Sequence, residues 1–506
     1  DSTAIIDSTG SAISYRMLLE VADQQMRQIA AGRQLVAIEA RNELLPLATY
    51  IGAVRAGHCV LVASSDTIDP ESRINRIFKP ACVFRSHGAT WSFERRQESS
   101  THALHPHLGI LLSTSGSTGS PKLVRLSHEN LLSNATSIAQ YLGISADDRA
   151  CTTLPWSYSY GLSVVNSHLT SGASIVLTEQ SVSSPDFWRA FTEHRATSFA
   201  GVPYTYELLE RAGFLDQEYP SLRYYTQAGG RLPPETVIRF AEYAERRRKQ
   251  FFVMYGQTEA TARMAYMPPD RILRFPRCIG QAIPGGHFCL RDERGEEIIE
   301  AGCQGELVYS GPNVMMGYAS VPEELAEGAA LPSLRTGDIA LRNDEGFYEI
   351  VGRSSRFLKI FGLRIALDDV ESLLNENQIP SVVTGDDTGL VIAIVGNPAR
   401  TSEAHNLVAH RLGLPKAAIS VTALERVPHL DSGKIDFREI LKSARAQSLV
   451  RKETAGSRGI RDRIGEILGV PEVNDEDNFL ALGGSSLNYV EVSLLRPDAA
   501  DVGLRG

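Results

Sequence analysis

The stretch 108–143, LGILLSTSGSTGSPKLVRLSHENLLSNATSIAQYLG, indicates how the chain around it folds. An apolar run opens the stretch and leads into a loop of serine, threonine and glycine. Apolar residues at helical spacing follow the loop: Leu131, Ala135, Ile138 and Leu142. A buried strand that ends in a polar loop before a helix is typical of α/β proteins.

The loop has the composition of a phosphate-binding site. Gly116 and Gly119 permit close approach of the backbone, and Lys122 supplies a positive charge. Hydroxyl donors fill the remaining positions: Thr114, Ser115, Ser117 and Thr118. The Walker pattern fails because Pro121 precedes the lysine, and the Rossmann pattern fails as well. Taken alone, the loop is also compatible with a hydroxyl-rich surface turn.

Short β-rich runs alternate with helical stretches over about the first 350 residues. The clearest runs are QLVAIEA (34–40), HCVLVAS (58–64), ASIVLTE (173–179) and FFVMYG (251–256). This alternation predicts a multi-layered α/β architecture with largely parallel sheets. From about Gly280, turn signals separate short strands, which predicts an antiparallel, β-barrel-like element that closes a large domain over residues 1–353.

The remainder of the chain contains three segments that differ in composition and residue pattern. Residues 354–445 contain VVTG, LVIAIVG and AISVTAL with helical stretches between them, which predicts a small α+β domain. Residues 446–457 are small and charged, as in a linker. Residues 458–506 begin with a stripe of isoleucine and leucine at helical spacing, so we expect a short helical segment there.

Composition excludes several classes of protein. The chain has 506 residues, of which 43% are hydrophobic and 22% charged, so it is neither disordered nor fibrous. Its net charge of −9 argues against nucleic acid as a partner. Six cysteines without a C-x-x-C pair suggest no disulfide framework. No apolar run is long enough to span a membrane and the first residues lack a signal-peptide pattern, so we expect a cytoplasmic protein.

The loop T-S-G-S-T-G-S-P-K resembles the phosphate loop of the adenylate-forming superfamily, which includes acyl-CoA synthetases, carrier-loading adenylation domains and luciferases. Five further elements follow in the family's order: YGQTE (255–259), TGD (336–338), GR (352–353), FLKIFG (357–362) and DSGKID (431–436). Each alone is compatible with an ordinary turn. Six elements in order, over residues 1–445, carry the resemblance.

The resemblance implies ATP and Mg²⁺ as cofactors and a catalytic role for residues that meet the phosphates. Residues 114–122 would cover the β- and γ-phosphates. Glu259 would hold Mg²⁺, with Thr258 near the α-phosphate. The activated carboxylate and ATP are both anions, so neutralisation and alignment are the chemical task.

The resemblance also assigns residues to the nucleoside. Asp338 would accept from the ribose hydroxyls, Arg353 would contact the ribose, and Tyr255 would lie along the adenine. Outside the pattern, these three are an ordinary turn residue, a solvated charge and a core aromatic. The cofactor-binding set implied by the family also includes Gly229, Gly230, Gly256 and Gln257.

Two lysines of the small domain lie in elements that the family uses for different half-reactions. Lys434 would bridge the reactants during adenylation, and Lys359 belongs to the thioester-forming element. The resemblance therefore implies a mobile small domain that rotates about a hinge after Arg353. The family's charged hinge residue is replaced by Ser355, which leaves the hinge residue itself unassigned.

The stretch from Trp156 to Tyr158 corresponds to the element that binds the substrate in relatives. Ser157 stands where α-amino-acid-activating domains place an aspartate against the ammonium, so an aliphatic or aryl acid is favoured. Tyr158 is either an aromatic gate or core packing, and the small Ala228 leaves depth for the acid. Arg263 is either a partner for a second carboxylate or structural, and we favour the structural role.

Residues 482–487, LGGSSL, resemble the signature of acyl and peptidyl carrier domains. The resemblance implies that a phosphopantetheinyl transferase attaches phosphopantetheine to Ser486, although an isolated serine there would be an ordinary helix N-cap. The match covers about fifty residues, and no helical pattern follows Pro497, so the completeness of this segment stays open.

These observations favour an acid–thiol ligase that forms an acyl-adenylate, releases pyrophosphate, and transfers the acyl group to a carrier protein in cis or in trans. Release of a free acyl-CoA is the nearest alternative. A non-catalytic ATP-binding scaffold is the alternative from a different class, and the presence of Lys434, Lys359 and Glu259 argues against it.

Overall fold

The computed structural model describes residues 2–88, 90–97, 102–113, 122–353, 357–360, 363–386, 389–412, 414, 416–430 and 435–444. The chain divides into two compact units, the first up to Ile350 and the second from Val351. The boundary expected after residue 353 stays a prediction. The linker 446–457 and the carrier-like segment 458–506 lie outside the described residues.

One sheet of the large unit has seven strands, of which the central four are parallel. In sheet order the strands are β19 (Gly317–Ala319), β8 (Leu123–Ser127), β7 (Leu108–Ser113), β4 (Cys59–Ala63), β3 (Leu35–Glu39), β5 (Cys82–His87) and β6 (Thr90–Arg95). Strands β3 and β4 are buried along their whole length, as expected of apolar parallel strands covered on both faces. Strand β7 is the apolar run that leads into the serine- and glycine-rich loop.

A second sheet has nine strands, with six parallel strands from β13 to β1. In sheet order the strands are β15 (Gln281–Ala282), β14 (Ala265–Tyr266), β13 (Gln250–Tyr255), β12 (Tyr224–Gln227), β11 (Ser198–Gly201), β9 (Arg149–Cys151), β10 (Ser174–Val176), β1 (Thr3–Ile6) and β2 (Ala12–Ser14). Antiparallel strands lie at both edges.

A third sheet has five strands, and the sequence predicted a barrel-like β element in this region. In sheet order the strands are β17 (Glu297–Ile298), β16 (His287–Arg291), β18 (Gln304–Ser310), β20 (Leu334–Arg342) and β21 (Tyr348–Arg353). The pairs from β17 to β20 are antiparallel, as predicted. The sheet has two edges, formed by β17 and β21.

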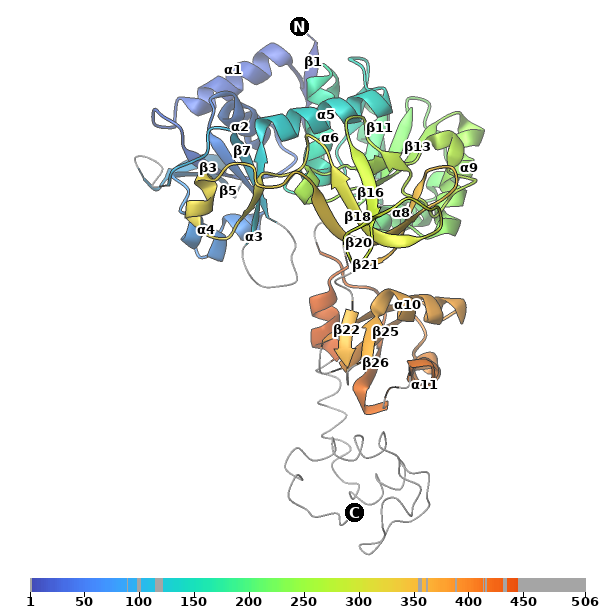
Figure 1. The fold of residues 1–506 in the computed structure, drawn as a ribbon. Coiled ribbons are helices and arrows are strands. Elements are labelled where there is room, and N and C mark those ends of the chain that lie inside the picture. Colours follow the sequence, from blue (N-terminus) through green and yellow to red (C-terminus); the bar gives the residue numbers. More distant parts are fainter. Residues whose placement is uncertain are drawn as a thin grey trace, which may run out of the picture. The chain divides into compact units, whose positions relative to one another are not determined.

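Nine α-helices accompany these sheets in the described part of the large unit. They are α1 (Tyr15–Met26), α2 (Leu44–Arg55), α3 (Ser65–Ile68), α4 (Arg73–Phe78), α5 (His128–Leu142), α6 (Ser159–Thr170), α7 (Pro185–Glu193), α8 (Pro203–Arg211) and α9 (Pro234–Arg247). Helix α5 begins at a reciprocal cap between Ser127 and Asn130 and ends at Gly143, whose φ of 60° suits glycine. Figure 1 shows α5 beside α6, and the two helices pack together.

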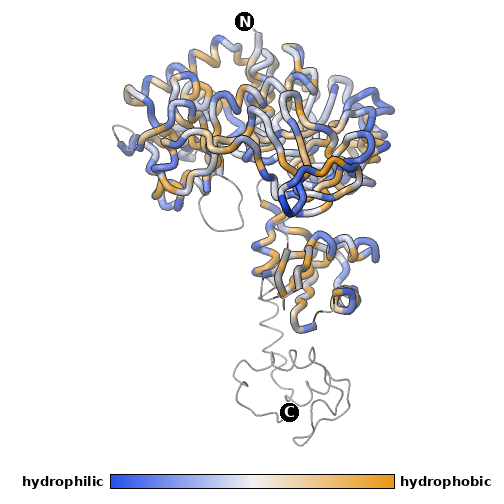
Figure 2. The backbone as a smooth tube through the Cα atoms, in the orientation of Figure 1, coloured by the Kyte–Doolittle hydropathy of each residue, from blue (hydrophilic) through white to orange (hydrophobic). Residues whose placement is uncertain are grey.

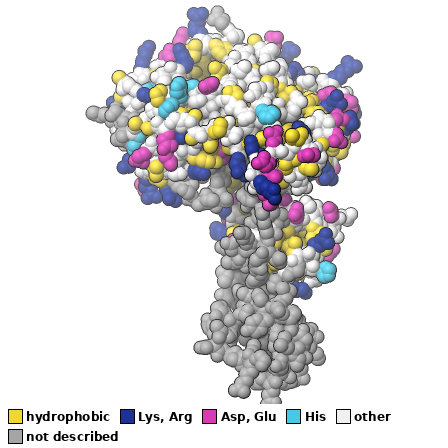
Figure 3. Space-filling model, in the orientation of Figure 1, with side chains coloured by type: hydrophobic (Ala, Val, Ile, Leu, Met, Phe, Trp, Pro, Cys, Tyr) yellow, Lys and Arg dark blue, Asp and Glu magenta, His cyan; other side chains and the backbone are white. Residues whose placement is uncertain are grey.

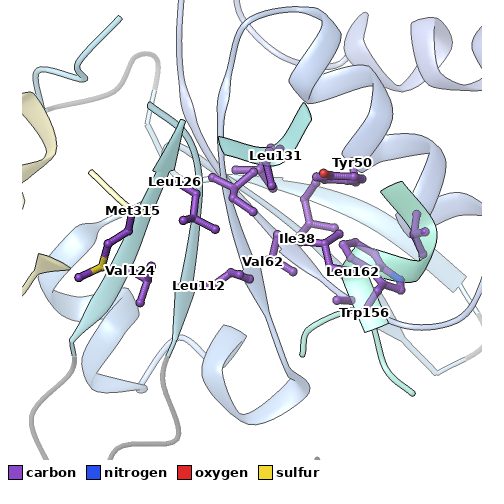
Figure 4. Packing of buried hydrophobic residues seen from close by; sticks show 14 of the residues in the cluster. Ile38, Tyr50, Val62, Leu112, Val124, Leu126, Leu131, Trp156, Leu162 and Met315 are labelled. Carbon is purple, nitrogen blue, oxygen red and sulfur yellow. The ribbon is translucent and has the colours of Figure 1, made fainter. Parts of the chain in front are cut away.

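The core of the large unit joins the seven-stranded sheet to α5 and α6. Ile38 and Val62 come from the parallel strands, while Leu131 and Leu162 come from the two helices. Figure 4 shows these side chains pointing toward one another. Apolar segments gather inside the unit (Figure 2), and acidic and basic side chains are interspersed over its visible face (Figure 3). The α/β prediction is therefore confirmed.

The small unit has α+β structure. Its elements are β22 (Phe357–Ile360), β23 (Leu363–Ala366), α10 (Leu367–Glu376), β24 (Ser381–Asp386), β25 (Gly389–Val395), α11 (Thr401–Leu412) and β26 (Ile419–Leu424). Val383 and Ile392 from the sheet pack with Leu374 and Val408 from the helices. Among the described helices of both units, none combines the length and apolarity needed to cross a membrane.

Candidate active site

The backbone doubles back tightly after β13, and this turn carries the YGQTE element. A Cβ atom on Gly256 would lie 1.6 Å from the carbonyl oxygen of Ala262, so only glycine fits there. The return path passes through Thr261 (φ 62°) and Ala262 (φ 124°), two positive φ values that are rare for residues with a side chain. Between them and the glycine lies the short 3₁₀ helix η2 (Thr258–Ala260). Close backbone contact therefore fixes the positions of Thr258 and Glu259.

One end of this turn binds the buried carboxylate of Asp338 on β20. The Tyr255 hydroxyl donates to Asp338 Oδ2 at 2.5 Å, and Gln257 Nε2 donates to the same oxygen at 3.0 Å. Gln257 also donates to the carbonyl oxygen of Thr336 at 2.9 Å. The structure thus brings together residues of the YGQTE and TGD elements, which lie about 80 positions apart in the sequence.

The other end of the turn places Glu259 beside a tyrosine and a lysine. The Tyr318 hydroxyl donates to Glu259 Oε1 at 2.9 Å. Lys122 Nζ lies 3.4 Å from the centroid of the Tyr318 ring, a cation–π contact. Burial, together with the neighbouring Glu259, raises the pKa of Tyr318, so the phenol stays protonated and remains a donor. Glu259, Tyr318 and Lys122 form what we call the acidic cluster.

Tyr318 was not predicted from the sequence. It lies in β19, which pairs antiparallel with β8 so that Tyr318 faces Val124, two residues after Lys122. The pairing joins positions almost 200 residues apart, and no local motif marks it. Only knowledge of this strand pair could have identified Tyr318.

A contact between two hydroxyls links the turn to the start of α6. Ser159 Oγ lies 3.1 Å from Thr258 Oγ1. Ser159 directly follows the stretch 156–158, which the sequence analysis assigned to the acid. The structure therefore places the residue expected near the α-phosphate beside the residues expected near the acid.

Tyr158 lies against the glycine pair that follows β12. A Cβ atom on Gly229 would lie 2.6 Å from the Tyr158 hydroxyl oxygen, and the φ of Gly229 is 83°. The backbone carbonyl of Gly230 accepts from Gln227 Nε2 at 2.8 Å. Burial raises the pKa of Tyr158 to about 12. The phenol therefore stays neutral, and Ala228 beside it is buried.

Trp156 has the contacts of a packing residue. Its indole is fully buried in the core of the large unit, with its ring centroid 5.5 Å from that of Tyr50 (Figure 4). Its N–H donates to the carbonyl oxygen of Arg41 at 2.6 Å. Its neighbour Ser157 is half-buried.

Residues 85–319 match the profile of the AMP-binding enzyme family. We call these residues the AMP-binding domain, after the family that they match. The matched range contains the serine- and glycine-rich loop, the YGQTE turn and Tyr318.

The relatives of this chain include a synthase subunit and a CoA ligase. Surfactin synthase subunit 2 of Bacillus subtilis is 25% identical over 533 residues, which cover 95% of this chain and 15% of that protein. Oxalate–CoA ligase of Arabidopsis thaliana is 28% identical over 350 residues, which cover 66% of this chain and 67% of that protein. The chain thus spans very different shares of these relatives.

Solved structures share the fold of most of this chain. The o-succinylbenzoate coenzyme A synthetase of Bacillus subtilis in complex with its acyl-adenylate intermediate has a TM-score of 0.68 at 21% identity, covering 87% of this chain and 95% of that chain. The same protein in complex with ATP and magnesium ion also has a TM-score of 0.68 at 21% identity, covering 87% of this chain and 97% of that chain. The fold is therefore shared with these synthetase structures.

Several predicted site residues lie outside the described residues: Thr114, Ser115, Gly116, Ser117, Thr118, Gly119, Lys434 and Ser486. Their roles stay predictions. Lys359 belongs to β22, but its side chain is likewise outside the description. In the small unit, the backbone N–H of Arg353 donates to Asp368 Oδ2 at 3.1 Å.

Glu259 is the carboxylate at the candidate site that could hold Mg²⁺. Within the described ranges, no group of three or more histidine, cysteine, aspartate or glutamate residues could form a metal site. Mg²⁺ is commonly held by one or two carboxylates together with substrate phosphates, and a single glutamate near Lys122, through Tyr318, suits that mode.

Proposed function

We propose that this chain activates a carboxylic acid with ATP, forming an acyl-adenylate and pyrophosphate, and then transfers the acyl group to the thiol of a phosphopantetheine on a carrier protein. One observation carries the proposal. A single strained turn joins the buried Asp338 network at one end to Glu259 of the acidic cluster at the other. Such a turn suits a ligand with a polyhydroxyl sugar at one end and phosphates with a metal at the other.

The reaction balances in two displacements. A carboxylate oxygen attacks the α-phosphorus of ATP, the bond from that phosphorus to the bridging oxygen breaks, and pyrophosphate leaves with the electron pair. A thiolate then attacks the acyl carbon, and AMP leaves with the oxygen that the acid contributed. The proton of the thiol goes to solvent or to a base, so no oxidant or reductant is required.

The nucleoside end of this proposal depends on Asp338. Its carboxylate would accept from the ribose hydroxyls, while Tyr255 and Gln257 hold it in place through Oδ2. Hydrogen bonds to a charged acceptor are stronger than neutral ones, which favours a buried aspartate for this task. Tyr255 would also lie along the adenine, with Gly229 and Gly230 permitting close approach of the base. Arg353 would contact the ribose.

The phosphate end of the proposal depends on Lys122 and Glu259, two members of the acidic cluster. Lys122 and the hydroxyl-rich loop 114–121 would neutralise the β- and γ-phosphates. Mg²⁺, when bound at Glu259, would offset charge on the phosphates. Thr258 would contact the α-phosphate, and Lys434 would lie between the two anionic reactants as they approach each other.

The acid is proposed to lack an α-ammonium group. Ser157 offers no counter-charge for one, and burying an ammonium without a counter-charge costs on the order of several kcal/mol. Tyr158 and Ala228 would line the acyl pocket. An aliphatic or aryl acid is therefore preferred over an α-amino acid.

Acid-dependent exchange of labelled pyrophosphate into ATP tests the adenylation step. We expect exchange with aliphatic or aryl acids, with AMP and pyrophosphate as products. Lys434→Ala should lower the exchange rate by on the order of 10² to 10³, by analogy with loss of a preorganised donor to a transition state. Release of ADP and phosphate, or exchange that ignores the acid, would contradict the proposal. ATP binding without turnover would favour the scaffold alternative.

The acceptor is tested separately. The relatives include a surfactin synthase subunit and a CoA ligase, and only the second name states a thiol acceptor, which is CoA. After incubation with CoA and a phosphopantetheinyl transferase, mass spectrometry should show one phosphopantetheine on the wild type and on Ser485→Ala. It should show none on Ser486→Ala. An unmodified wild type that converts free CoA into acyl-CoA would instead establish the CoA ligase alternative.

A further inference from the structure

Arg263 is a buried cation directly behind the YGQTE turn. Its exposed fraction is 2%. Its backbone carbonyl accepts from Asn134 Nδ2 at 2.9 Å and from Asn313 Nδ2 at 3.2 Å. The preceding residue, Ala262, has the strained φ of 124°. Hydrogen bonds therefore hold the backbone in a costly conformation that keeps the guanidinium inside the domain.

Among the described residues, the partners of the guanidinium are all neutral. Nε donates to Ser163 Oγ at 3.0 Å, and Nη1 donates to the Tyr141 hydroxyl at 3.3 Å and to Met254 Sδ at 3.6 Å. The guanidinium carbon lies 5.0 Å from the centroid of the Tyr160 ring. In the part of the chain that the structure describes, no carboxylate forms an ion pair with Arg263. Since arginine stays protonated in proteins, its charge is not neutralised there.

The neighbouring titratable groups do not supply a negative charge. Burial raises the pKa of the Tyr141 phenol and that of the Tyr160 phenol. Burial lowers the pKa of His168, which lies nearby, to about 4, so its imidazole is neutral at pH 7. At neutral pH these groups are therefore uncharged. Their dipoles can orient toward the guanidinium, but they do not neutralise its positive charge.

A second buried arginine shows what a structural role looks like in this chain. Arg125 is 1% exposed, and its guanidinium donates to the backbone carbonyls of Tyr318 at 3.0 Å and Glu327 at 2.5 Å. It also lies 3.8 Å from the Glu327 carboxylate. Arg263 has no such backbone acceptors or carboxylate among the described residues. A role in packing alone therefore does not explain why residue 263 carries a positive charge.

Tyr160 connects Arg263 to Tyr158 in the stretch assigned to the acid. Tyr160 beneath the guanidinium meets Tyr158 edge-on, with ring centroids 6.3 Å apart. Tyr160 directly follows Ser159, whose hydroxyl lies 3.1 Å from that of Thr258. Ser159 and Tyr160, at the start of α6, thus connect Thr258, which is expected near the α-phosphate, to the buried Arg263.

We propose that the acid this chain activates carries a second anionic group at its far end, and that Arg263 binds that group. The substrate class would be a dicarboxylic acid, because a guanidinium matches a carboxylate with two parallel hydrogen bonds. Ser163 and Tyr141 would hold the guanidinium in plane. This inference rests on the proposed function, since it names the substrate of the same site.

Matched acid pairs test the inference in the wild-type protein. Each pair differs only in a terminal carboxylate or methyl group: butanedioate with butanoate, hexanedioate with hexanoate, and benzene-1,4-dicarboxylate with 4-methylbenzoate. In pyrophosphate exchange we expect kcat/KM to favour the diacid of fitting length by about 10²-fold or more, because a site built around a buried charge rejects a ligand that leaves it unpaired. A preference for the methyl-ended acids across all pairs would overturn the inference.

Variants separate recognition from structure. Arg263→Met should abolish the diacid preference, Arg263→Lys should keep part of it, and the exposed-arginine control Arg189→Met should leave it unchanged. If Arg263 is purely structural, Arg263→Met should instead lower the thermal midpoint and the activity toward both acids of a pair, and the ratio of the two activities should be preserved. That result would overturn the inference. If Arg263→Met does not fold, the wild-type ratios decide alone.

The same assay distinguishes failure of the Arg263 assignment from failure of the proposed function. Exchange with monoacids alone would overturn only the assignment of Arg263. No exchange with any acid would overturn the proposed function and the inference together.

Discussion

Gly229→Ala tests whether Tyr158 lies against the backbone at the candidate acid site. The added Cβ would lie 2.6 Å from the Tyr158 hydroxyl oxygen and 3.1 Å from Val202 Cγ1. Both distances are shorter than ordinary van der Waals contacts, so the tyrosine must move. Gly229 also has a φ of 83°, which costs an alanine about 1 kcal/mol or more.

Gly285→Ala is the matched control. Gly285 has a φ of 84°, but its added Cβ would meet nothing closer than Pro312 at 3.9 Å. Both variants therefore carry the same backbone strain, and only Gly229→Ala adds a clash. Overpacking of this kind costs about 1–3 kcal/mol. We expect Gly229→Ala to lose that much more free energy of unfolding than Gly285→Ala, measured by urea denaturation.

Tyr158→Phe supplies the second arm of a double-mutant cycle. Without the hydroxyl, the ring atom nearest the added Cβ would be Cζ, at 3.6 Å. Gly229→Ala should therefore cost less in the Tyr158→Phe background, with a coupling free energy of about 1 kcal/mol or more. The KM for the acid should rise in Gly229→Ala and partly recover in the double variant. Equal losses at Gly229 and Gly285, with no coupling, would refute this placement of Tyr158.

Three further predictions concern other parts of the chain. Asp338→Asn should raise the KM for ATP about tenfold or more, because a charged acceptor is lost, and an unchanged KM would remove Asp338 from the nucleotide site. The pKa of His168 is lowered by burial from 6.5 to about 4, so the unfolded chain binds a proton between these pH values that the native state does not. The free energy of unfolding should therefore fall by up to about 3 kcal/mol as the pH drops from 6.5 to 4, and urea titrations of His168→Gln should lack this decrease. Lys359→Ala should spare pyrophosphate exchange and impair thioester formation, whereas equal losses in both steps would contradict its assignment to the second half-reaction.

The elements with a strong local pattern could be predicted from the sequence. The runs 34–40 and 58–64 became β3 and β4, and the stripe from Leu131 to Leu142 lies in α5. Their periodicity and composition are local properties, so no partner is needed to recognise them. The order of strands is not local, and no local pattern shows that β1 pairs with β10.

The candidate site shows the same division. The YGQTE and TGD elements could be identified from the sequence because they occur in the family's order. The bond between Tyr255 and Asp338 could not, because β13 and β20 belong to different sheets. Arg263 illustrates a further limit. Its sequence neighbours cannot show that its described side-chain partners are all neutral, whereas the structural Arg125 meets backbone carbonyls and a carboxylate.

Transfer of oxygen from the acid to AMP tests the central claim most directly. The acid is supplied with ¹⁸O at both oxygens of its carboxylate, together with ATP and a thiol acceptor, and the AMP is analysed by mass spectrometry. Attack of the carboxylate on the α-phosphorus predicts one ¹⁸O atom in each AMP formed during acyl transfer. AMP without the label, or label found in inorganic phosphate, would contradict a mixed anhydride of the acid with AMP.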